Sequence, residues 1–84
     1  MNKLENLRKK ILYRASYRGT KEMDLLLRSF VKYNIDLFDI DQLNELQVFL
    51  DFEDEVISNF YYNNILTEEL KKNKIIDIFK KFKL

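Results

Sequence analysis

The segment from Arg14 to Asp24 holds the densest group of side chains able to do polar chemistry. Arg14 and Arg18 are four residues apart, which places both on one face of a helix. Gly19, the only glycine, follows directly, and Glu22 and Asp24 fall where the first turn of a next helix would lie. Arginines and carboxylates form charge-assisted hydrogen bonds. On residue types alone this pattern is more typical of a structural corner between two helices, although it could also form a binding surface.

The rest of the composition limits what chemistry the chain can do. Its 84 residues include no Cys and no His. A Ser-His or Cys-His nucleophile system, a zinc site of the usual ligands and a thiol redox centre are therefore excluded. An enzyme would have only Glu22, Asp24 or tyrosines as acid or base, so we predict that the chain is not an enzyme.

Charge is segregated along the chain, although the net charge is only +1. Lysine and arginine outnumber acids in residues 1–32 and again in residues 68–84, whereas residues 33–67 carry acids and no base. Such blocks can steer a partner of complementary charge, or they can simply solvate exposed faces.

Helical periodicity runs through most of the chain and no segment alternates like a strand, which predicts an all-α single domain over residues 1–84. Capping residues and apolar stripes predict about five short helices, at about residues 3–17, 20–34, 40–50, 55–62 and 68–82, with Asn2, Thr20, Asp39, Asp54 and Thr67 at their starts. Gly19 is expected at the C′ position of the first helix with a positive φ.

The same polar segment resembles the signature of the succinate dehydrogenase flavin-assembly factors, the SdhE-like family. That signature is a Tyr/Arg-rich helix end, then Arg-Gly-x-x-Glu-x-Asp, then an apolar helix. Here it stands as Leu12-Tyr13-Arg14 and as Arg18 to Asp24 followed by three leucines. The resemblance extends over about residues 5–79.

The resemblance implies a small five-helix protein that binds the flavoprotein subunit of succinate dehydrogenase, or of the similar fumarate reductase, and promotes covalent attachment of FAD there. It also implies that the histidine accepting the flavin belongs to the partner, so that no FAD is tightly bound here. By position, the partner-binding residues would be Arg14, Tyr17, Arg18, Gly19, Glu22 and Asp24.

These residues also carry expectations about stability. If Arg18 and Glu22 are surface groups, changing either to alanine should alter stability by no more than about 0.5 kcal/mol. Asp24 has an alternative structural role, pairing with Arg28 four residues further on.

Other interpretations stay open. A helical adaptor for another protein is the main alternative, and a basic nucleic-acid-binding module is a weaker one. Its helix-turn-helix version fails because the helix after residue 39 carries acids and no Lys or Arg. The basic, amphipathic stretch 1–18 is compatible with a transit peptide, but its continuous helical period favours a structural first helix. We therefore expect a monomeric, cytoplasmic protein, and the abundance of Lys, Asn and Ile favours a bacterial source.

Overall fold

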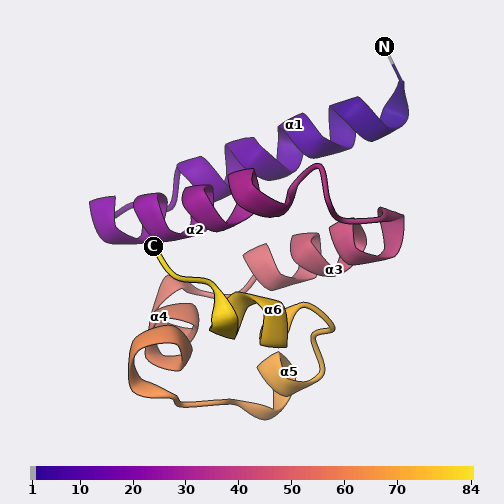
Figure 1. Ribbon diagram of the computed structural model, residues 1–84. Coiled ribbons are helices and arrows are strands. Elements are labelled where there is room, and N and C mark those ends of the chain that lie inside the picture. Colours follow the sequence, from indigo (N-terminus) through magenta and orange to yellow (C-terminus); the bar gives the residue numbers. More distant parts are fainter. Residues whose placement is uncertain (1) are drawn as a thin grey trace.

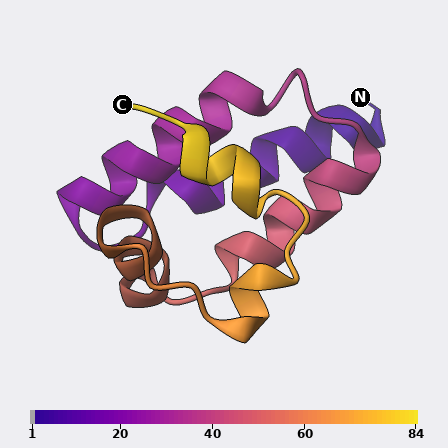
Figure 2. The same cartoon turned by 60° about the horizontal axis from the view of Figure 1, so that its bottom comes forward.

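The computed structural model describes residues 2–84, and every regular element in that range is a helix. The long helices α1 (Lys3–Ser16) and α2 (Lys21–Asn34) run antiparallel, side by side. Beneath them α3 (Ile40–Leu50) packs against α1, and α4 (Asp54–Asn63), α5 (Glu68–Lys71) and α6 (Ile76–Lys81) complete the other side (Figures 1 and 2). The prediction of an all-α fold is confirmed. None of the described helices combines the length and the apolar character that a membrane span requires.

Four of the helices in residues 2–84, α1, α2, α3 and α5, begin where local capping signals place them. Asn2 Oδ1 accepts a hydrogen bond from the Glu5 amide at 2.7 Å, and Thr20 and Thr67 cap α2 and α5 in the same way. At α3 the Asp39 side chain accepts from the Gln42 amide while the Gln42 side chain accepts from the Asp39 amide, which is a complete capping box. These caps satisfy backbone donors that the first helical turn leaves unpaired.

The core is centred on Phe79 of α6, which is fully buried. Its ring lies 5.0 Å from that of Phe30 and 4.8 Å from that of Phe49, between ring centroids. Phe60 and Tyr61 contribute further ring contacts from α4. One aromatic side chain therefore joins α2, α3, α4 and α6, which fixes the position of the α3–α4 loop relative to α2.

The last predicted helix is wrong in one respect, because residues 72–75 interrupt it and the described chain has six helices. Asn73 is buried and causes the break. Its Oδ1 accepts from the Ile75 amide and its Nδ2 donates to the Glu45 carbonyl oxygen at 3.0 Å. A side chain that bonds nearby backbone competes with helical pairing. The bend brings Ile75 and Ile76 into the core.

The predicted cap of α4 is also wrong. Glu53 occupies the N-cap position without a side-chain cap bond, and Asp54 is the first helical residue. The Asp54 carboxylate instead accepts a hydrogen bond from Arg18, far away in the sequence.

Candidate functional site

The turn of residues 17–20 connects α1 to α2 and carries the only glycine of the chain. Gly19 has φ +113°, as expected, but it lies two residues after the C-cap residue Tyr17 and is therefore not at C′. A Cβ built on Gly19 would have no atom within 4 Å, so the backbone there faces open space. Glycine is required by the conformation of this turn, not by a neighbouring atom.

Arg18 ties this turn to the far side of the fold. Its Nε donates to Asp54 Oδ1 at 2.8 Å, and its two terminal nitrogens donate to the carbonyl oxygens of Leu50 at 2.7 Å and Phe52 at 2.9 Å. Only 11% of the Arg18 side chain is exposed, and 26% of the Asp54 side chain. The expectation that Arg18 is a surface group is therefore wrong. Its guanidinium group fixes the end of α3 and the start of α4 against the turn.

Asp24 of α2 also holds this turn, through the backbone of Arg18. Its Oδ1 accepts a hydrogen bond from the backbone amide of Arg18 at 2.5 Å. The alternative role of Asp24, a pair with Arg28, is not found among the ion pairs of residues 2–84. Arg18 is therefore fixed through its backbone by α2 and through its side chain by the α3–α4 loop.

Arg14 makes a second, more exposed link between α1 and the end of α3. It forms an ion pair with Asp51 and donates to the Gln47 carbonyl oxygen at 3.3 Å. The Asp51 side chain is 70% exposed, so solvent screens this pair far more than the Arg18–Asp54 pair.

Three of the predicted residues are left facing solvent: Tyr17, Gly19 and Glu22. Tyr17 is 70% exposed, and its ring contacts that of Tyr13, with 4.7 Å between centroids. Glu22 borders a hollow of about 340 Å³ that it shares with Leu25, Tyr62 and Leu84. Of the six predicted residues, three are therefore exposed. The other three, Arg14, Arg18 and Asp24, form contacts that hold the turn or the end of α3 in place.

Three exposed residues beside the predicted site were not among the predicted site residues. They are Tyr13, which contacts Tyr17, and Leu25 and Tyr62, which lie beside Glu22. Leu25 and Tyr62 are about half exposed, and both lie beside Glu22. A signal for Leu25 was available, since it falls outside the stripe of core residues that α2 buries. Tyr62 could not be found in this way, because its place beside α2 depends on how α4 packs.

The fold and the site together define a class: a small all-helical protein with a rigid polar turn that can bind through charge and hydrogen bonds. Residues 9–83 match the model of the family described as "Flavinator of succinate dehydrogenase". The chain belongs to this family, which confirms the resemblance noted in its sequence.

Two relatives illustrate this membership. The chain is 26% identical over 69 residues to the "FAD assembly factor SdhE" of Acetobacter pasteurianus, a match that covers 82% of this chain and 63% of that protein. It is 40% identical over 60 residues to "Succinate dehydrogenase assembly factor 2, mitochondrial" of Dictyostelium discoideum, covering 71% of this chain and 43% of that protein. The chain therefore spans less than two thirds of the length of each relative.

Proposed function

We propose that this chain binds the flavoprotein subunit of succinate dehydrogenase and promotes the covalent attachment of FAD to that subunit. The observation that carries the proposal is the turn of residues 17–20. It has the family's Arg-Gly-x-x-Glu-x-Asp pattern, and its Gly19 backbone is open to a partner. The names of the two relatives support the same role.

The exposed and buried residues of the turn have different roles in this proposal. Tyr17, Gly19 and Glu22 contact the flavoprotein, because they face solvent. Arg18 and Asp24 act as positioning residues, since their groups are engaged within the protein. Binding to a turn that is already fixed costs less conformational entropy than binding to a mobile loop.

The chemical step belongs to the partner. The resemblance implies that the histidine accepting the flavin belongs to the flavoprotein, which agrees with the absence of histidine in this chain. We infer that the chain holds the flavoprotein in a conformation in which attachment is autocatalytic. We propose further that it is a monomeric, cytoplasmic assembly factor and not an enzyme. It binds neither FAD tightly nor nucleic acid, and the fumarate reductase flavoprotein is an alternative or additional partner.

The test combines the purified chain with the flavoprotein subunit lacking FAD, and then adds FAD. Covalent flavin is read as fluorescence that survives denaturing electrophoresis. We expect the chain to raise the covalent fraction and to form a complex with the subunit that is detectable by gel filtration. Equal covalent flavin without the chain, together with no complex, would overturn the proposal and leave a helical adaptor for another partner.

A variant pair tests the role of the turn. Glu22→Gln should weaken the complex by about tenfold, because a charge-assisted contact is lost. Glu69→Gln is the matched control, since Glu22 and Glu69 occupy the same position, two residues after a capping threonine. Equal effects of the two changes would show that Glu22 is not a partner contact.

A further inference from the structure

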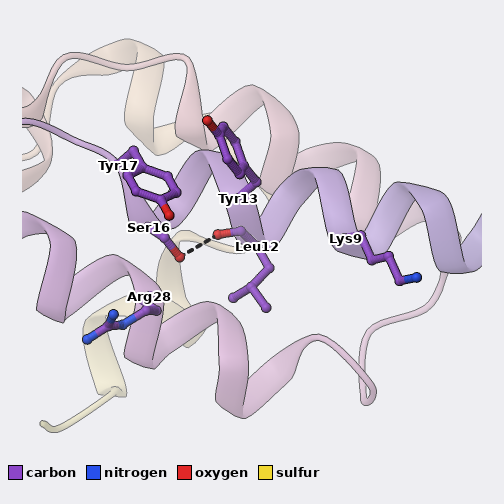
Figure 3. Close-up of a pocket in the computed structure, with 6 residues that line it drawn as sticks. All are labelled: Lys9, Leu12, Tyr13, Ser16, Tyr17 and Arg28. Atoms are coloured by element: carbon purple, nitrogen blue, oxygen red, sulfur yellow. Dashed lines mark hydrogen bonds between the residues drawn. The ribbon is translucent and has the colours of Figure 1, made fainter.

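A hollow between α1 and α2 lies beside the turn of residues 17–20, and the proposed function assigns no role to it. It has a volume of about 360 Å³, and Figure 3 shows its lining, which comes from both helices: Lys9, Leu12, Tyr13, Ser16, Tyr17 and Arg28. Tyr13 and Tyr17 are each about two-thirds exposed. A pair of exposed aromatic rings on a solvent-facing hollow offers contact area that a partner could cover.

The charge of this hollow is positive. Its lining includes Lys9 and Arg28 and no acidic residue. Arg28 is exposed and makes no hydrogen bond or ion pair with any residue in the range 2–84. The carboxylate that helical spacing offers to it, that of Asp24, is instead used by the Arg18 amide. Within residues 2–84, Arg28 therefore has no carboxylate partner in the hollow.

The hollow is also continuous with the turn. Tyr17 lines the hollow and directly precedes Arg18 and Gly19. Tyr17 therefore belongs both to the turn of residues 17–20 and to the lining of the hollow, so the hollow adjoins the turn.

From this arrangement we propose that the hollow between α1 and α2 receives an acidic segment of the flavoprotein subunit. One or more carboxylates of that segment pair with Arg28 and Lys9, and its neighbouring side chains cover the rings of Tyr13 and Tyr17. This inference rests on the proposed function, because it names the partner's contact at the same surface. Arginine and lysine paired with carboxylates form stronger hydrogen bonds than neutral groups do.

Charge reversal tests the pairing. Arg28→Glu should weaken binding of the flavoprotein subunit by about tenfold or more and reduce the dependence of association on salt. Lys32→Glu is the matched control, an exposed cation one turn further along α2 that does not line the hollow, and it should change the affinity by less than about threefold. Thermal melts of both variants check that each remains folded. Equal effects of the two reversals would mean that only overall charge matters and would overturn the inference.

Cross-linking identifies the occupant directly. A carbodiimide couples an amine to a carboxylate without a spacer, so the complex should yield a Lys9 link to an Asp or Glu of the flavoprotein, mapped by mass spectrometry. Reversing that acid to lysine should restore binding to the Arg28→Glu chain. A complex that forms normally but gives neither the link nor the rescue overturns this inference alone, whereas the absence of any complex with the unaltered chain overturns the proposed function as well. Arg28-dependent binding of free FAD, measured by flavin fluorescence, would assign the hollow to the cofactor instead.

Discussion

Arg18 Nε donates to Asp54 Oδ1 at 2.8 Å, which joins two residues 36 positions apart in the chain. Arg18 belongs to the turn after α1 and Asp54 to the first turn of α4. The same guanidinium group binds the last carbonyl oxygen of α3. The arginine of the family motif is therefore a structural link between α2, α3 and α4.

The first prediction concerns the stability that this link supplies. Arg18→Ala should lower the free energy of unfolding by about 2–4 kcal/mol, because it leaves a mostly buried carboxylate and two carbonyl oxygens without their donor. Arg14→Ala should cost no more than about 1 kcal/mol, since Asp51 is largely exposed. Urea unfolding followed by circular dichroism compares the two. Similar losses for both variants would contradict the structural role of Arg18.

The second prediction concerns the hydrogen bond from the Arg18 amide to Asp24. Asp24→Ala should lower stability by about 1–3 kcal/mol and speed hydrogen exchange at the Arg18 amide. Asp24→Asn keeps an acceptor oxygen and should have a smaller effect on both quantities. If the exchange of that amide is unchanged in Asp24→Ala, the hydrogen bond does not hold the turn.

The third prediction concerns why position 19 requires glycine: the positive φ of the backbone or the space around the Cβ position. Gly19→Ala should cost about 1–3 kcal/mol, because an L-residue at φ +113° is strained although no atom blocks its Cβ. A chemically synthesised chain with D-alanine at position 19 tests this cause, since a D-residue favours positive φ. We expect the D-alanine chain to regain most of the stability in a thermal melt. If it were as unstable as Gly19→Ala, backbone strain at positive φ would not explain the loss.

D-alanine at position 19 also probes the approach of the partner. A stable fold combined with weakened flavoprotein binding would show that the partner lies against the bare backbone of the turn. Unchanged affinity would place the contact elsewhere on the exposed surface.

The fourth prediction concerns the bend between α5 and α6. Asn73→Ala should lower stability by about 1–3 kcal/mol, because the Glu45 carbonyl oxygen and the Ile75 amide both lose their partner. Asn64→Ala is a comparison at an exposed asparagine with φ 60°, which loses a left-handed conformational preference and an exposed hydrogen bond from Lys80 Nζ but no buried bond. If chemical denaturation gives a loss for Asn73→Ala below about 0.5 kcal/mol, the bend does not depend on this side chain.

Features that depend only on residues within one helical turn could be predicted from the sequence. The caps at Asn2, Thr20, Asp39 and Thr67 each join a side chain to a backbone amide three residues further on. The positive φ of Gly19 follows from the conformational freedom of that one residue. The motif around Gly19 also identified the family, because its spacing is visible in the sequence.

The partners of the motif's charged residues, in contrast, depend on tertiary packing. Arg18 could be assigned to a surface from its type and spacing, and nothing near it in the sequence marks Asp54 or the Leu50 carbonyl oxygen as its partners. The bend at Asn73 has the same origin, since Glu45 lies 28 residues away on α3. Such contacts depend on how the aromatic core sets α3, α4 and α6 against the first two helices. That packing is a property of the whole chain, whereas capping and periodicity are properties of short segments.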